Sequence, residues 1–291
     1  WHDWYLSSNI SNKKNLDKQL LPELKSDGIP KNLSRTAIPF EYNNINSFLK
    51  QFNKNRNKVG AVIMEPLRSD KPNKEFLKTI REVTKNNDVP LIFDEITSGF
   101  HDNLGGIHLK LKVNPDIAIF SKALGNGTPI AAIIGKRSIM DCAQESFISS
   151  TMWTERIGFI AALETLKKMK QKNVQRKTVK YGLYIKSNWS KIAKKIGLDI
   201  NISGMSSMPN FTLNYKNSNN LYTYFTQEMI NEGFLASNSL TISYAHNLKT
   251  IKSYLKSTEK VFKKIKLIVD KNLKVPLKYS ARQTNFKRLV K

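Results

Sequence analysis

The sequence predicts an α/β protein built on a mostly parallel sheet that helices cover on both faces. Short apolar runs with polar exits recur between Val59 and Ile134, and a helical pattern separates the first two. Near-continuous apolar strands are typical of parallel strands buried on both faces. Asp94 and Lys122 stand at the exits of two of these runs, as residues do at the carboxyl edge of a parallel sheet, where sites commonly lie.

Four apolar runs are the expected strands, namely 59–64, 90–94, 116–120 and 130–134. A helix is expected over residues 73–86, because Phe76, Leu77, Ile80 and Val83 form one apolar stripe. Asn73 is a suitable N-cap for this helix, since its side chain can accept from the first free N–H groups. The order strand, helix, strand favours a parallel sheet with a helical layer.

The segments before and after these strands lack the repeated apolar runs and show loop-like or helical patterns instead. Residues 7–37 show little periodicity and are expected to be mostly loop, followed by a short helix over 45–53. After the sheet, the pattern predicts helices over 137–145, 154–169, 172–196, 220–231 and 250–270, and a half-exposed strand over 211–215. In the second of these helices, Ile157, Ile160, Ala161, Leu163 and Leu166 are expected to face inward.

These patterns divide the chain into three parts. We expect a large domain over 1–170, a smaller C-terminal α+β domain over 171–274, and a loose basic tail over 275–291. The chain of 291 residues is long enough to bury a sizeable core.

The composition is that of a globular protein with a large excess of positive charge. It is 40% hydrophobic and 24% charged, with a formal net charge of +25. Such a charge raises a nucleic-acid-binding function as an alternative. The lysines are scattered among asparagines, which favours solvated faces over a nucleic-acid site.

The single cysteine and the lengths of the apolar runs bear on the cellular compartment of the protein and on its contact with a membrane. One cysteine, Cys142, excludes an intrachain disulfide and a cysteine-based metal cluster, and it fits a reducing, cytoplasmic compartment. Apolar runs fall short of the ~20 residues that a membrane span needs, so we expect no membrane partner.

Lys122 and Asp94 together indicate a particular chemistry. Desolvation lowers the pKa of a lysine in an apolar setting, and the neutral amine then attacks a carbonyl to form a Schiff base. An aspartate on a neighbouring strand can hold a pyridine nitrogen protonated, and such a pair is the protein's share of pyridoxal phosphate (PLP) chemistry. Taken singly, Asp94 reads as a helix cap and Lys122 as a surface lysine. Together, with Gly125 and Gly127 following the lysine, they favour the coenzyme.

Several sequence blocks carry a resemblance to a known family. They are WHDWY from Trp1, VIMEP from Val62, LIFDEITSGF from Leu91, PDIAIFSKALGNGTPIAAIIG from Pro115 and SSTMWTERIG from Ser149. In this order they resemble the class III aminotransferases, PLP-dependent enzymes of fold type I, and most of all the glutamate-1-semialdehyde aminomutases among them.

The resemblance implies a role for each matching residue. Lys122 would be the Schiff-base lysine, and Asp94 would pair with the pyridine nitrogen. Ile96 would pack on one face of the ring, and Thr151 would reach the coenzyme phosphate of the neighbouring subunit; from the residues alone, Thr151 reads as a helix cap. Two further residues would take lesser parts, Ser121 at the phosphate and Glu95 behind the residues that touch the coenzyme.

The resemblance also implies an activity: PLP-dependent transfer of an amino group, as an aminotransferase or a 2,1-aminomutase. The implied partners are a small amino or keto substrate and a second copy of the chain, in a homodimer with shared active sites. The family's Tyr-His-Gly element and glycine–serine phosphate loop would precede Trp1. We therefore expect an N-terminally truncated chain that retains the coenzyme weakly. An inactive remnant is the alternative within the family, and the substrate is not specified by the sequence.

Overall fold

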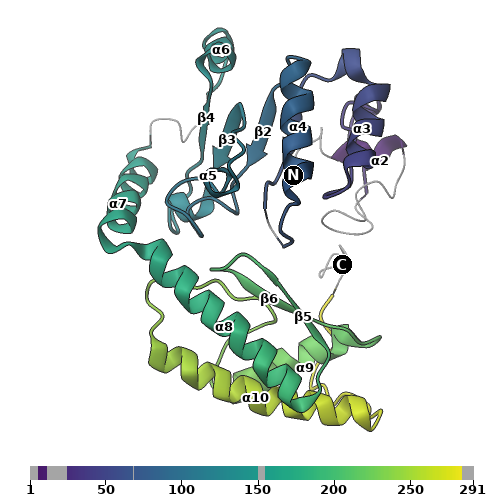
Figure 1. Ribbon diagram of the computed structural model, residues 1–291, viewed down its shortest axis with the longest axis vertical. Coiled ribbons are helices and arrows are strands. Elements are labelled where there is room, and N and C mark those ends of the chain that lie inside the picture. Colours follow the sequence, from purple (N-terminus) through teal and green to yellow (C-terminus); the bar gives the residue numbers. More distant parts are fainter. Residues whose placement is uncertain (1–5, 12–24, 68, 150–154, 284–291) are drawn as a thin grey trace. The chain divides into compact units, whose positions relative to one another are not determined.

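The computed structural model describes residues 6–11, 25–67, 69–149 and 155–283 (Figure 1). The chain forms two compact units, one of Trp1–Lys58 with Leu277–Lys291 and one of Val59–Pro276. All the site residues predicted from the sequence belong to the second unit. The domain boundary expected near residue 170 stays a prediction.

The first unit is held by a small aromatic cluster. Helix α3 (Ile45–Lys54) begins where the Asn44 side chain accepts from the backbone N–H of Ser47, and it matches the helix expected over 45–53. Phe48 packs against Phe52, with ring centroids 5.6 Å apart, and against Phe40 at 5.3 Å. The short helices of this unit are α2 (Ser8–Ser11), η1 (Lys31–Leu33) and η2 (Arg56–Lys58).

The second unit opens with the expected sheet, and its strand order is β1-β2-β3-β4. The strands are β1 (Val62–Met64), β2 (Leu91–Asp94), β3 (Ile117–Phe120) and β4 (Ala132–Gly135). The first three are parallel, and β4 pairs antiparallel with β3. The prediction of a mostly parallel sheet from the apolar runs is therefore confirmed.

Helix α4 (Lys74–Asn86) connects β1 to β2, as the strand–helix–strand pattern predicts. Its apolar stripe is buried, with Phe76 and Ile80 fully inaccessible to solvent. Asn73 caps it by accepting from the backbone N–H of Glu75. Three short elements follow β2 and β4: α5 (His108–Leu111), α6 (Arg137–Met140) and η4 (Asp141–Glu145).

Helix α7 (Arg156–Lys172) corrects one expectation. Ile157, Ile160 and Leu163, expected to face inward, are 66%, 60% and 66% exposed. The buried positions of the helix are Gly158 and Ala162, and Leu166, also expected to face inward, packs half-buried against the cluster that contains Ala162. A Cβ at Gly158 would lie 3.1 Å from the carbonyl oxygen of Pro129, so the close approach favours glycine there.

The C-terminal part of this unit has a separate aromatic core. Its elements are α8 (Val174–Ile196), β5 (Ile200–Gly204), β6 (Pro209–Leu213), α9 (Ser218–Asn231) and α10 (Leu248–Asp270). Phe211 of β6 lies at the centre, with its ring centroid 5.0 Å from Trp189, 5.1 Å from Phe225 and 5.2 Å from Phe262. All four side chains are completely buried, so α8, α9 and α10 are packed around the β5–β6 hairpin.

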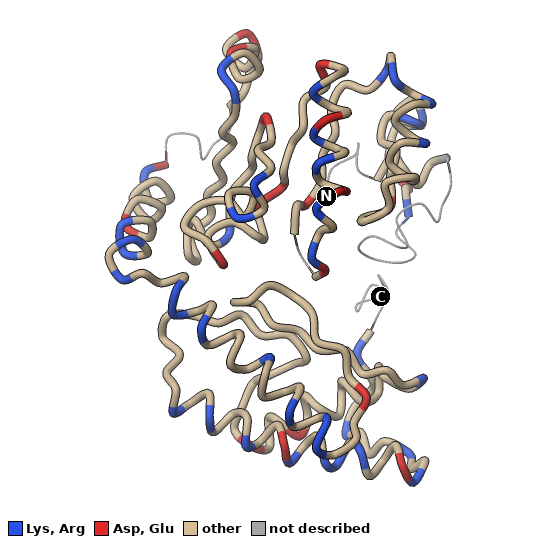
Figure 2. Tube along the Cα trace, viewed as in Figure 1, with Lys and Arg blue, Asp and Glu red and all other residues tan. Residues whose placement is uncertain are grey.

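Positive charge follows the two long C-terminal helices (Figure 2). Acidic residues on α9 and α10 pair with several of these lysines, as Glu259 does with Lys195 at 3.1 Å and Glu228 with Lys264 at 2.6 Å. In the part of the chain that the structure describes, none of the helices has the length and apolar character needed to cross a membrane.

Candidate active site

Asp94 and Lys122 lie at the same edge of the sheet. In the parallel pairing of β2 and β3, Asp94, the last residue of β2, is opposite Ile119. Lys122 begins the short helix η3 (Lys122–Leu124) directly after β3. Because neighbouring strands are about 4.8 Å apart, the two predicted residues leave the sheet next to each other.

A hydrogen bond joins the Lys122 side chain to the segment that follows β2. Its amine donates to the hydroxyl oxygen of Thr97 over 2.8 Å. The Lys122 backbone has φ of 45°, in the left-handed region that costs a side-chain-bearing residue energy and that clusters at functional sites. The apolar setting expected for this lysine is not provided by the described residues, because Lys122 is exposed to solvent.

The glycine loop after Lys122 is shaped by a close backbone approach. A Cβ at Gly125 would lie 2.1 Å from the carbonyl oxygen of Thr128, so no side chain fits there without a change in the turn. Ser121 donates its hydroxyl to the carbonyl oxygen of Ile130 over 2.7 Å. That proton is therefore not available to a phosphate in this rotamer, and the contact expected of Ser121 stays a prediction.

Asp94 has one oxygen engaged and one open. Its Oδ1 accepts from the backbone N–H of Ile96 at 3.0 Å, which turns the chain at the end of β2. Its Oδ2 receives no hydrogen bond from the residues that the structure describes. Asp94 and Ile96 are both half-buried, so each has a surface that a bound molecule could contact.

Glu95 is turned away from this edge and organises the segment between β2 and α5. It is completely buried. Its carboxylate accepts from the backbone N–H groups of Ile107 at 2.5 Å and His108 at 3.0 Å, from the His108 Nδ1 at 2.6 Å and from the Ser98 hydroxyl at 3.0 Å. These contacts close the loop between β2 and α5; the place expected for Glu95 behind the residues that would touch the coenzyme stays a prediction.

Asp102 connects the same loop to the C-terminal part of the unit. Its Oδ2 accepts from the backbone N–H of Ser206 at 2.8 Å. Its Oδ1 accepts from the backbone N–H of Ser207 at 2.8 Å and from the Ser207 hydroxyl at 2.6 Å. Burial alone would raise the pKa of Asp102, but these hydrogen bonds stabilise the carboxylate and leave its pKa below the ordinary value.

His101, beside Asp102, is placed to remain uncharged. Burial lowers its pKa; the Asp102 charge raises it, and the nearby Lys122 charge lowers it, so that the pKa lies below the ordinary 6.5. His101 therefore adds no positive charge to this edge of the site at neutral pH.

These shifts predict a two-step loss of stability in acid. The unfolded His101 takes a proton near 6.5, whereas the folded residue takes it only at lower pH, so the free energy of unfolding should decline below pH 6.5. The lowered pKa values of Glu95 and Asp102 contribute stability above their ordinary 4.5 and 3.8, and this is lost as the pH falls through the folded values.

Urea unfolding at about pH 7.5, 5.5 and 3.5 tests this expectation. His101→Gln should remove the first decline and keep the second, whereas stability that falls equally in both proteins between the first two pH values would contradict the assignment to His101.

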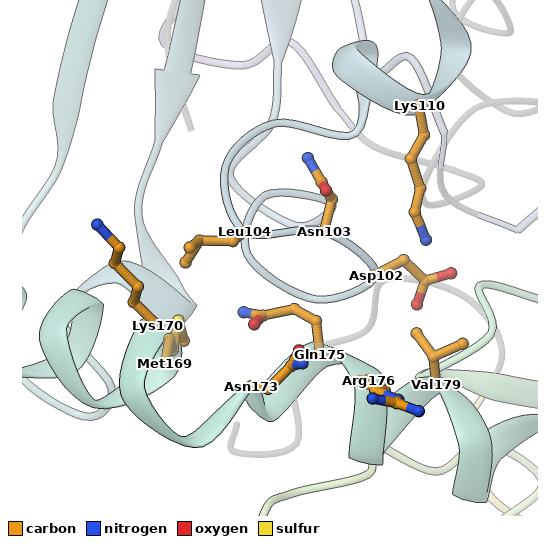
Figure 3. A pocket seen from close by; sticks show the side chains of 10 residues that line it. All are labelled: Asp102, Asn103, Leu104, Lys110, Met169, Lys170, Asn173, Gln175, Arg176 and Val179. Atoms are coloured by element: carbon orange, nitrogen blue, oxygen red, sulfur yellow. The ribbon is translucent and has the colours of Figure 1, made fainter.

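A hollow of about 280 Å³ lies between residues 102–110 and the junction of α7 with α8 (Figure 3). Lys122 and Asp94 do not line it. Gln175 of α8 borders it and donates to the carbonyl oxygen of Phe100 over 2.9 Å, which holds the loop to α8. Thr151, the remaining predicted coenzyme contact, falls outside the described residues.

Three residues with a part in this geometry were missed from the sequence. Thr97 could have been found, because it follows the β2 exit by only a turn and such positions supply ligands at sheet edges. Asp102 and Gln175 had no usable signal, since their partners lie 105 and 75 positions away in the chain.

The comparisons with known proteins decide the family. The family model described as Aminotransferase class-III matches residues 11–269. The chain belongs to the class-III aminotransferases. The resemblance seen in the sequence blocks is thereby confirmed.

Curated relatives are similar over most of this chain but are longer than it. The glutamate-1-semialdehyde 2,1-aminomutase of Caldicellulosiruptor saccharolyticus is 29% identical, over 84% of this chain and 62% of that protein. The 3-aminobutyryl-CoA aminotransferase of Cloacimonas acidaminovorans is 29% identical, over 78% of this chain and 53% of that protein. The chain thus spans somewhat more than half the length of these relatives.

Solved structures confirm the fold. The FumI protein of Sphingopyxis sp. MTA144, in its PLP internal aldimine form, matches with a TM-score of 0.81 at 18% identity, covering 94% of this chain and 70% of that one. The acetylornithine aminotransferase of Elizabethkingia anophelis matches with a TM-score of 0.70 at 23% identity, over 77% and 62%. The class-III chain therefore has the fold of PLP-dependent transaminases, as the resemblance implied.

Proposed function

We propose that this class-III chain transfers an amino group with PLP as its coenzyme. The observation that carries the proposal is the placement of Lys122 and Asp94 at the exits of adjacent parallel strands. Family membership supports it, as do the relatives described as aminomutases and aminotransferases. The substrate would be a small amine or amino acid together with its keto or aldehyde counterpart.

The residues present fit the coenzyme. Asp94 offers a carboxylate oxygen that the described residues leave open, which suits a protonated ring nitrogen. Lys122 offers an amine that reaches out from the sheet edge to Thr97. Ile96 offers an apolar surface beside Asp94. A carboxylate, an amine and an apolar side chain at one sheet edge are the groups that the protein contributes to PLP chemistry.

When bound, the coenzyme supplies an electron-withdrawing ring that accommodates negative charge from the substrate carbon. Asp94 would hold a proton on the ring nitrogen of the coenzyme and so favour the positively charged ring. Lys122 would hold the coenzyme through its amine, which becomes free when a substrate amine takes its place. The released amine then removes a proton from the substrate carbon and returns it at a neighbouring position, as a general base and acid.

Asp94→Asn tests this division of work. The amide cannot hold the ring proton by charge, so we expect amino transfer to slow by about 10²–10³-fold, as when a charge-stabilising group is removed from other active sites. The readout is the single-turnover absorbance change of PLP-loaded protein mixed with a set of amino donors. Asp88→Asn, in the turn before β2, is the matched control and should react at the wild-type rate. Equal rates in all three proteins would refute the role of Asp94.

The requirement for an amino acceptor distinguishes the two reactions. An aminotransferase stops after one turnover unless a keto acid is supplied, whereas a 2,1-aminomutase returns the amino group to the same carbon skeleton and continues without one. Supplying glutamate-1-semialdehyde alone, and then an amino donor with a keto acid, separates the two. Absence of turnover under both conditions, with coenzyme bound, would favour an inactive remnant.

A homodimer in the cytoplasm completes the proposal. The exposed apolar side chains of α7, Ile157, Phe159, Ile160 and Leu163, support association with a second copy, because monomeric proteins seldom expose such a group together. Cys142 is an exposed free thiol, which fits a reducing compartment. Sedimentation equilibrium measures the association directly.

A further inference from the structure

The segment 95–107, which carries Thr97 and His101, is fixed by one side chain at its start and one near its middle. Near β2, the Glu95 carboxylate accepts hydrogen bonds from the backbone N–H groups at the start of α5. Further along, Asp102 accepts three hydrogen bonds from Ser206 and Ser207. Both carboxylates are buried, with Asp102 only 7% exposed, so these interactions are shielded from water.

The serines that Asp102 binds form the turn between β5 and β6, and this turn is itself firmly held. A Cβ on Gly182 of α8 would lie 1.7 Å from the carbonyl oxygen of Ser206, so the α8 backbone abuts the turn directly. The Lys186 amine, one turn further along α8, donates to the carbonyl oxygen of Gly204 at 2.6 Å. The turn is therefore fixed against α8.

An apolar contact joins the same two segments a second time. Met205, beside the serines, is 2% exposed and packs in a cluster with Ile107, at the end of the loop, and Leu67. The loop and the turn are thus connected by a buried carboxylate at Asp102 and by apolar packing at Ile107. Figure 3 shows Asp102 on the side of the loop that faces α8.

We propose that Asp102 is a positioning residue for the lysine site: it ties the 95–107 segment to the β5–β6 turn and so holds Thr97 where it receives the Lys122 amine. Motion of α8 and its turn is thereby transmitted to the lysine. This inference rests on the proposed function, because it assigns Asp102 a part in presenting Lys122 to the coenzyme. The resemblance of the sequence blocks assigned no role to this residue.

Asp102→Asn is the decisive variant, because it keeps the size of the side chain and places an NH₂ group against one of the N–H or hydroxyl donors. Ser207→Ala is the graded variant, since it removes only the hydroxyl and keeps both backbone donors. Asp116→Asn is the matched control: Asp116 is 5% exposed and accepts from the Leu91 N–H and the Arg81 side chain, but it lies at the opposite end of β3 from Lys122.

The first readout needs no coenzyme. Amide hydrogen exchange of the full chain, followed by mass spectrometry, should be about tenfold faster in peptides covering 95–107 and 203–210 for Asp102→Asn, less so for Ser207→Ala, and unchanged there for Asp116→Asn. Exchange in α4 should not respond in the Asp102 variant. Unchanged exchange in either of the two segments would overturn the coupling.

The second readout is the rate at which Lys122 captures PLP, measured by borohydride trapping and peptide mapping at several pH values. Asp102→Asn should slow capture by about tenfold and Ser207→Ala by less, whereas Asp116→Asn should match the wild type. Faster exchange with an unaltered capture rate and pH profile would show that Asp102 only stabilises the fold. If the wild type forms no adduct at Lys122, the proposed function and this positioning role both fail, while the exchange readout still decides whether the segments are coupled.

Discussion

Replacing Lys122 by alanine should abolish amino transfer. The variant loses both the amine that bonds to the coenzyme and the base that moves the substrate proton. Loss of the base alone is expected to slow the reaction by about 10²–10⁴-fold. The measurement is turnover with saturating PLP and an amino donor, so that weak coenzyme retention does not limit the result.

A nearby lysine provides the control for this variant. Lys110 of α5 is also exposed and belongs to the same unit. It lines the hollow near the α7–α8 junction, which Lys122 does not line. Lys110→Ala should retain the wild-type rate. A Lys122→Ala protein that still transfers amino groups at more than about a tenth of the wild-type rate would show that another residue carries the chemistry.

Replacing Glu95 by alanine should cause the largest loss of stability among single changes at the site. Its removal leaves two backbone N–H groups, the His108 ring and the Ser98 hydroxyl without their buried acceptor. Breaking a buried charged interaction of this kind costs about 3–5 kcal/mol. Urea unfolding monitored by circular dichroism gives the change in free energy.

An exposed glutamate on α4 is the matched control for Glu95. Glu75 is 3.8 Å from Lys78, and its side chain is 70% exposed. Glu75→Ala should therefore change the free energy of unfolding by no more than about 1 kcal/mol. If the Glu95 and Glu75 variants were equally stable, the buried carboxylate would not be what closes the loop.

The three parallel strands could be predicted because they show as short apolar runs, in which fully buried residues alternate with half-buried ones. The run at residues 116–120 is of this kind, whereas α4 could be predicted from the apolar stripe that it buries. Strand β5 was missed although Ile200 and Ile202 alternate with Asn201 and Ser203, because the alternation is short and ends at Gly204. It forms through pairing with β6, where Ile200 lies opposite Leu213, and such a partner is not visible in the local sequence.

The exposure of α7 could not be predicted for a different reason. A periodic apolar stripe shows that one face of a helix is suited to burial, but the stripe does not identify the surface that packs against this face. In this chain Gly158 and Ala162, together with half-buried Leu166, make the closest packing contact, whereas Ile157, Ile160 and Leu163 remain exposed. Small residues at a close helix contact carry almost no signal in a hydrophobic pattern.

The candidate site also has a part that could be predicted from local sequence and a part that could not. Lys122 and Asp94 were predictable because a strand exit is a local feature that the sequence displays. The contacts that hold their surroundings, from Asp102 to Ser207 and from Gln175 to Phe100, depend on the packing of distant segments. Prediction from the sequence therefore found the chemical groups but not the contacts that orient them.

The most direct test of the account is the mapping of PLP on the wild-type chain. The protein is incubated with excess PLP, reduced with borohydride and digested, and the modified peptides are identified by mass spectrometry. If Lys122 is the lysine that binds the coenzyme, the adduct should concentrate on Lys122 at stoichiometric amounts, with other lysines modified only in proportion to their exposure. Modification spread evenly over exposed lysines, with Lys122 no more reactive than Lys110, would contradict it.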